Sequence, residues 1–178
     1  MTLLRNPIVD LDRPRSSIAA LIALGALAIV SAAWGFEFAG FTPCKLCLIQ
    51  REPYYLAMPL ALMAFGNERI DGPARLTRAI FLVLIGLFVW GGSVGFYQAG
   101  AEWGHWPGPT DCGATRGATI PTAAGDLLGS LGKVKIVDCT KAQIRIFGLS
   151  FAGWNVLTSA GLVLFTGAGL LLPNRPRT

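Results

Sequence analysis

The sequence predicts an all-α membrane protein: a four-helix transmembrane bundle with a long outer loop between the third and fourth spans. The chain has 178 residues, of which 53% are hydrophobic and only 14% are charged, and its mean hydropathy is +0.54. These values lie outside the usual range of soluble domains. The charges are also unevenly placed and leave long uncharged runs. We therefore expect a single membrane domain over 1–178.

Three uncharged runs, of 21, 23 and 29 residues, can each cross a hydrocarbon core about 30 Å thick: Ser16 to Phe36, Ala79 to Ala101 and Ile146 to Asn174. A fourth run, Pro53 to Asn67, has 15 residues and covers only about 22 Å as a helix. It crosses only if it begins earlier, near Leu46, which brings Arg51 and Glu52 into the membrane edge. We expect the spans at about 18–38, 46–65, 79–97 and 149–172, and the loop at about 98–145.

The density of Lys and Arg predicts the orientation. The two termini and segment 66–78 carry eight basic residues in 34 positions, whereas segments 39–45 and 98–145 carry six in 55. The positive-inside rule then places both termini in the cytoplasm. This topology accounts for the net charge of +5, and no basic stripe indicates nucleic-acid binding. A signal peptide ending at Ser31-Ala32-Ala33 is an alternative for the first run, which is long for such a segment.

In this topology all four cysteines fall on the outer side, where disulfides persist: Cys44, Cys47, Cys112 and Cys139. Cys44 and Cys47 form a C-x-x-C at the start of the second span, with Thr42 as the expected N-cap and Pro43 at the first helical position. Residues three apart share a helix face and are near enough to bridge. The helix N-terminus and Lys45 favour thiolates, so we expect a lowered pKa for this pair.

Arg51 lies four residues beyond Cys47, and Tyr54 lies seven beyond it, so both continue the same helix face. A charge at this depth in the membrane is functional by default, although an arginine that reaches the surface with help from Glu52 is an alternative. Cys112 and Cys139 are 27 positions apart in the loop. A plain structural disulfide between them would contribute roughly 3 to 4 kcal/mol.

Metal and haem sites are disfavoured by the spacing of the cysteines. The second pair lacks the close spacing of zinc ligands, and the chain has one histidine, His105. Leu48 follows the C-x-x-C where a haem attachment motif has histidine. Segment 141–147 mixes basic and apolar residues, which is typical of a segment that lies on lipid headgroups.

These residues resemble the DsbB family of quinone-dependent disulfide bond formation proteins of the bacterial inner membrane. The resemblance is carried by three stretches: Pro43 to Arg51 (PCKLCLIQR), Glu102 to Pro109 (EWGHWPGP) before Cys112, and Gly148-Leu149-Ser150 with Trp154-Asn155. Gln98 departs from the pattern, since relatives often have histidine there, and this puts a quinone contact of that histidine in doubt. Vitamin K epoxide reductase relatives place the loop cysteines before the membrane C-x-x-C, so the order here argues against them.

The resemblance implies that the chain reoxidises a periplasmic DsbA-like thioredoxin-fold protein and passes the electrons to ubiquinone or menaquinone. Cys112 would exchange with the partner's thiol, Cys139 would resolve the mixed disulfide, and Cys44 would then receive the electrons. Cys47 would face the quinone, with Arg51 stabilising negative charge and Tyr54 adding to the quinone site. Two alternatives stay open: a thiol reductase that runs in the opposite direction, and a non-enzymatic membrane scaffold with two structural disulfides.

Overall fold

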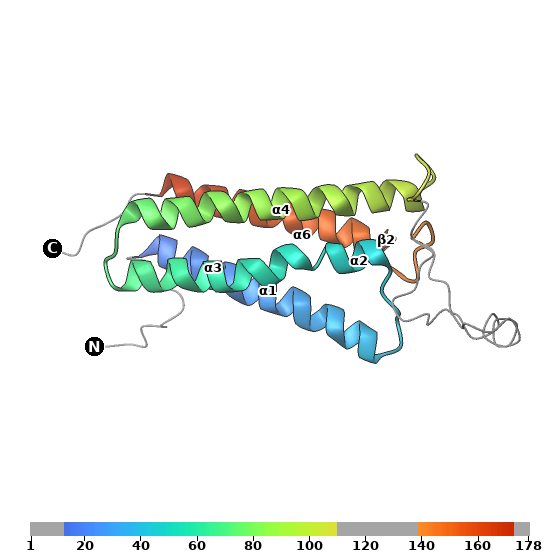
Figure 1. The fold of residues 1–178 in the computed structure, drawn as a ribbon, viewed down its shortest axis with the longest axis horizontal. Helices are drawn as coiled ribbons and strands as arrows, with labels where there is room; N and C mark the ends of the chain where they lie inside the picture. Colours follow the sequence, from blue (N-terminus) through green and yellow to red (C-terminus); the bar gives the residue numbers. More distant parts are fainter. Residues whose placement is uncertain (1–12, 110–138, 173–178) are drawn as a thin grey trace, which may run out of the picture.

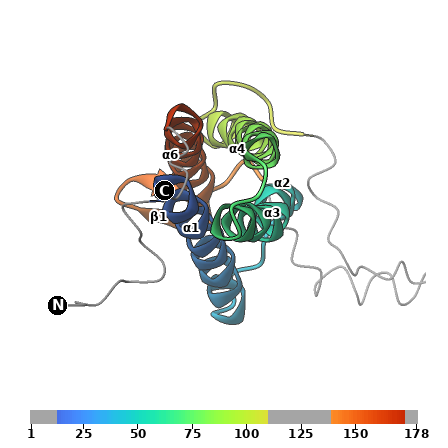
Figure 2. The ribbon, with the colours of Figure 1, turned by 90° about the vertical axis from the view of Figure 1, so that its left-hand side faces the viewer.

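The computed structural model describes residues 13–109 and 139–172. Four long helices run side by side (Figure 1): α1 (Pro14–Phe38), α3 (Glu52–Arg69), α4 (Ala74–Glu102) and α6 (Phe151–Leu171). A five-residue helix, α2 (Lys45–Ile49), precedes α3, and two short strands, β1 (Arg145–Ile146) and β2 (Leu149–Ser150), precede α6. Viewed from one end, the four long helices surround a common centre (Figure 2).

The surface of the bundle is apolar along the helices. Among the described residues, α1, α4 and α6 are long and apolar enough to cross a membrane. Their outer faces expose large side chains, such as Leu164 at 75% and Phe96 at 62%. A water-soluble bundle rarely exposes apolar surface on this scale. The chain is therefore an all-α membrane protein, apart from the two-residue strands.

Two of the helices extend beyond the uncharged runs of the sequence. Helix α1 begins at Pro14 and not near 18, because proline fits the first turn of a helix, where its missing N–H is not needed. Helix α4 covers Ala74–Glu102 and so exceeds the expected 79–97 at both ends. Helix α6 lies within the expected 149–172.

The continuous helix expected over 46–65 is instead two helices. α2 ends at Ile49, and α3 begins at Glu52 after a turn at Gln50 and Arg51. Pro53 explains the interruption, because it has no N–H to donate to the Ile49 carbonyl and its ring would clash with that group in a continuous helix. At the start of α3 the same residue costs no hydrogen bond.

A tight hairpin positions the start of α6. The strands pair antiparallel, with Arg145 opposite Ser150, and the two turn residues between them, Phe147 and Gly148, have φ values of 51° and 82°. Two positive φ values are typical of the two-residue hairpin turn that matches strand twist. Ser150 then caps α6, since its Oγ accepts a hydrogen bond from the Gly153 N–H at 3.2 Å.

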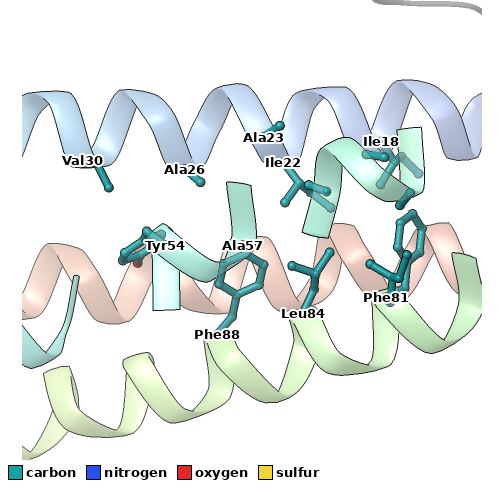
Figure 3. Packing of buried hydrophobic residues seen from close by; sticks show 14 residues of the cluster. Ile18, Ile22, Ala23, Ala26, Val30, Tyr54, Ala57, Phe81, Leu84 and Phe88 are labelled. Atoms are coloured by element: carbon teal, nitrogen blue, oxygen red, sulfur yellow. The ribbon is translucent and has the colours of Figure 1, made fainter. Parts of the chain in front are cut away.

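The apolar core lies where α1, α3 and α4 meet (Figure 3). Phe81, Leu84 and Phe88 of α4 are fully buried, and they pack with Ile22 of α1. The face of α3 toward this core carries alanines, among them Ala57. Small side chains let helices approach closely, which is how packing holds a bundle together where lipid removes the hydrophobic driving force.

Arginine side chains fix one end of the bundle, which we call the basic end. Arg15 is buried, and its Nε donates to the Gly169 carbonyl of α6 at 3.2 Å. Arg13 forms an ion pair with Asp71 at 2.8 Å and donates to the Glu68 carbonyl of α3. These contacts satisfy carbonyls that a helix leaves unpaired at its C-terminus. The start of α1 and the ends of α3 and α6 therefore lie together, and Cys44 lies at the opposite end.

The contact between α3 and α4 gives a test of the packing. A Cβ on Gly91 of α4 would lie 2.9 Å from Cγ of Pro53, whereas a Cβ on Gly86 would meet no atom within 4 Å. We expect Gly91→Val to lower the free energy of unfolding by about 1–3 kcal/mol more than Gly86→Val, because the rigid proline ring leaves no room. Thermal unfolding in detergent measures the difference, and equal losses would contradict the close packing.

Candidate functional site

The C-x-x-C cysteines form a close thiol pair at the start of α2. Cys44 and Cys47 are free thiols whose sulfur atoms lie 2.9 Å apart. Cys44 is the N-cap of α2, and its Sγ accepts a hydrogen bond from the Cys47 N–H at 3.3 Å. The expected N-cap, Thr42, and the expected first helical residue, Pro43, are thus each wrong by two residues. Because a disulfide needs about 2.05 Å between its sulfurs, a small movement would close this pair.

The pKa of Cys44 differs from the lowered value that the sequence predicts. The hydrogen bond with the Cys47 thiol, together with burial, raises the pKa of Cys44 well above its ordinary value. The predicted lowering is therefore wrong for this member of the pair. Two thiols so close cannot both ionise easily, so the first proton lost makes the second harder to remove.

A glutamine of α4 touches both sulfurs. Gln98 is buried, and its Oε1 lies 3.8 Å from each sulfur while its Nε2 lies 3.5 Å from the Cys47 sulfur. Gln50, in the turn after α2, donates to the same Oε1 at 2.7 Å. Position 98 is thus in direct contact with the dithiol, through a side chain that does not titrate.

The Gln98 amide also binds a carboxylate one helical turn further along α4. Its Nε2 donates to Oε1 of Glu102 at 3.1 Å. The second oxygen of Glu102, Oε2, is buried and has no hydrogen-bond partner among the described residues. Residues four apart on a helix share a face, so Gln98 and Glu102 present one polar patch toward the dithiol.

Arg51 lies in the turn between α2 and α3 and reaches across to α1. Its Nη1 forms an ion pair with Oε1 of Glu37 at 2.8 Å. The partner is therefore Glu37, and not the neighbouring Glu52 considered from the sequence. Both side chains are largely shielded, so the pair holds the end of α1 against the start of α3.

Tyr54 lies in the first turn of α3, and its hydroxyl contacts residues of α6. Its hydroxyl donates to Oδ1 of Asn155 at 2.6 Å and lies 3.1 Å from Oγ of Ser159. Asn155 in turn donates to the Gly91 carbonyl of α4 at 3.0 Å. Tyr54 is almost completely buried, and this hydrogen-bonded group forms a polar layer between the dithiol and the apolar core.

Cys139 is the loop cysteine within the described residues. It is disulfide-bonded and buried, and it packs in one small cluster with Cys44, Leu46 and Cys47. Cys112 lies outside the described residues. The segment after Cys139 is held over the site, because Gln143 donates to the Thr42 carbonyl. His105 contacts aromatic rings beyond the end of α4.

A cavity of about 330 Å³ borders both sulfurs. Its walls come from α1, α2, α3, α4, segment 141–146 and α6. Figure 1 shows that the end of α1 leans away from the other helices. Apolar side chains such as Ile29, Phe36 and Phe151 make much of the wall, while Gln98, Glu102, Arg51 and Tyr54 supply polar groups. This mixture suits a flat apolar molecule that carries a few oxygens. The residues described here contain no group of three potential metal ligands.

The sequence predicted some of these site residues but not others. Cys44, Cys47, Arg51 and Tyr54 all line the cavity. The roles of Glu37, Gln50, Glu102 and Asn155 as partners came only from the structure. The four-residue spacing of Gln98 and Glu102 was a usable signal for a shared face. No comparable spacing links Glu37 to Arg51, which are on different elements.

Comparisons with known proteins identify the family. Residues 15–169 match the family described as Disulfide bond formation protein DsbB. Disulfide bond formation protein B of Nitrosomonas europaea is 33% identical over 164 residues, covering 87% of this chain and 92% of that protein. Uncharacterized protein RP370 of Rickettsia prowazekii is 24% identical over 162 residues, covering 91% of each. No solved structure matches the chain. Since the family match runs from the first turn of α1 almost to the end of α6, this chain belongs to the DsbB family of disulfide bond formation proteins.

Proposed function

We propose that the chain oxidises a periplasmic DsbA-like thiol protein and passes the electrons, through its two cysteine pairs, to a membrane quinone. The observation that supports this most directly is the burial of Cys139 against Cys44. Thiol–disulfide exchange requires a thiolate to approach a disulfide sulfur. A disulfide-bonded loop cysteine and a free thiol in one cluster meet that requirement.

Each step of the proposed exchange conserves electrons and protons. The partner's two thiols reduce a Cys112–Cys139 disulfide, lose two electrons and two protons, and become a disulfide. The loop thiols then reduce a Cys44–Cys47 disulfide by attack at Cys44, which restores the loop disulfide. The result has free thiols at Cys44 and Cys47 and a disulfide at Cys139, which is the arrangement in the structure.

The cavity beside the dithiol fits a quinone headgroup. Its volume of about 330 Å³ and its apolar wall suit a substituted ring, within the range of ligand pockets. A bound quinone would accept two electrons and two protons, which reoxidises the pair. Cys47 borders this cavity, and the Arg51 guanidinium offers donors to a quinone oxygen. Because the Tyr54 hydroxyl is already bound to Asn155, we assign Tyr54 to the cavity wall through its ring.

We further propose four spans with both termini in the cytoplasm of a bacterium and the cysteines at the periplasmic face of the inner membrane. Helix α3 would be the remaining span, with α2 at the membrane edge. The support is the separation of the arginine-rich basic end from the cysteines along the bundle, together with the positive-inside rule.

Both ends of α4 test this orientation. In a full-length chain with its four cysteines replaced by serine, a membrane-impermeant maleimide should label His105→Cys but not Arg75→Cys in intact cells. Both native residues are exposed, so access to the reagent differs only through the membrane. Permeabilised cells should show labelling of both. Labelling of Arg75→Cys alone in intact cells would reverse the proposed orientation.

The quinone assay tests the activity and its direction. Purified protein mixed with a reduced DsbA-like protein and ubiquinone should reduce the quinone, because electrons flow toward the more oxidising acceptor. Cys47→Ser should abolish this rate, and Arg51→Ala should lower it about tenfold or more, as expected for the loss of one hydrogen bond to a charged group. Arg78→Ala, an exposed arginine near the basic end, is the matched control. An undiminished rate in Cys47→Ser would remove that residue from the pathway.

Trapping tests the roles of the loop cysteines. In Cys139→Ser, the free Cys112 thiol can attack the disulfide of the oxidised partner, and Cys139 is no longer present to resolve the mixed disulfide, so a covalent complex should accumulate and disappear on reduction. Non-reducing electrophoresis detects it, and Cys112→Ser combined with Cys139→Ser should not form it. A membrane scaffold with inert disulfides gives no complex in either variant, so its absence would favour that reading.

A further inference from the structure

The contacts of Gln98 are unequal for the two sulfurs. Its acceptor, Oε1, lies 3.8 Å from both, but its donor, Nε2, lies 3.5 Å from the Cys47 sulfur. A thiolate only accepts hydrogen bonds, whereas a thiol also donates. In this orientation the amide can stabilise a thiolate on Cys47 and accept the proton of a thiol on Cys44. It opposes the Cys47 backbone N–H, which favours a thiolate on Cys44.

Glu102 determines which way this amide points. A carboxylate accepts and does not donate, so the Gln98 atom that faces Glu102 has to be Nε2, as observed at 3.1 Å. Oε1 is then turned toward the sulfurs and toward Gln50, whose Nε2 donates to it. In the flipped amide, oxygen would occupy the position 3.5 Å from the Cys47 sulfur, and nitrogen the position 3.8 Å from both. The preference for a thiolate on Cys47 would be lost.

We propose that Glu102 is a positioning residue which, through the Gln98 amide, makes Cys47 rather than Cys44 the nucleophilic sulfur of the reduced pair. This assignment rests on the proposed function, in which Cys47 is the sulfur that borders the quinone cavity. The other charged groups that border the cavity are Arg51, which is paired with Glu37, and Lys141. Among the described residues, Glu102 is the charged group that is hydrogen-bonded to Gln98, and it therefore sets the orientation of this amide.

The direction in which one substitution changes the reactivity of Cys47 distinguishes a positioning role of Glu102 from a purely electrostatic one. If the charge of Glu102 acted only through space, removing it would ease ionisation of Cys47, since like charges oppose one another. If Glu102 acts through Gln98, removing it releases the amide and weakens the Cys47 thiolate. Glu102→Leu should therefore make Cys47 less reactive relative to Cys44, which is the opposite of the electrostatic effect.

The experiment compares alkylation of the two cysteines in the reduced, full-length protein in detergent. Limiting iodoacetamide at neutral pH modifies thiolates, and trypsin cleavage after Lys45 places Cys44 and Cys47 on separate peptides for mass spectrometry. Gln98→Leu and Glu102→Leu should each lower the ratio of Cys47 to Cys44 alkylation by about tenfold, as expected for one hydrogen bond to a charged group. Glu102→Gln should give an intermediate ratio, because its amide can face Gln98 either way.

Two further variants complete the test. Adding Glu102→Leu to Gln98→Leu should cause no further fall, because a residue that acts through Gln98 has no effect without it. Asn67→Leu removes another buried amide, near the basic end, and should leave the ratio unchanged. A rise or no change in Glu102→Leu, or a further fall in the double variant, would overturn the proposal. The readout needs neither quinone nor partner, so it can fail or succeed independently of the quinone assay.

Discussion

The interruption between α2 and α3 is the constraint on which the site depends. Because Pro53 prevents a continuous helix, the residues on either side of the break reach different neighbours. Gln50 bonds to Gln98 of α4, Arg51 to Glu37 of α1, and Tyr54 to Asn155 of α6. The turn that follows the short helix, together with the start of α3, is thereby fixed against each of the other three long helices. A straight helix would present these side chains on one face only.

The sequence predicted which segments form the long helices more accurately than it predicted where those helices end. Lipid requires long uncharged runs, so the runs predicted α1, α4 and α6. The ends depended on side-chain partners that hydropathy does not describe: Arg15 is buried because α6 offers carbonyls to it, and Glu102 stays in α4 beside Gln98. Pro53 explains the break after Ile49. The break was not predicted, because the uncharged run from Pro53 to Asn67 was too short to cross the membrane and the span was therefore extended back to Leu46.

For the site, spacing along the chain predicted the pair of Cys44 and Cys47 and the approach of Arg51 and Tyr54. It did not predict what those groups bind, because each partner comes from another helix. The pairing of Arg51 with Glu37 changes the electrostatic argument. A lone guanidinium would act as a full positive charge near the sulfurs, whereas an ion pair acts over distance as a weaker dipole. Stabilisation of a thiolate then depends more on neutral donors in direct contact, which among the described residues are the Cys47 N–H for Cys44 and the Gln98 amide for Cys47.

Glutamine at position 98 suits that task in a way that histidine does not. A histidine changes its charge close to neutral pH, so the field that it creates at the sulfurs varies with its own protonation. An amide provides a donor and an acceptor at every pH at which the thiols titrate, but its two ends are nearly the same in shape, and nothing within the amide selects its orientation. A neighbouring carboxylate supplies the missing selection, since it accepts only. The contact between Gln98 and Glu102 thus gives a neutral side chain a fixed polarity toward the dithiol.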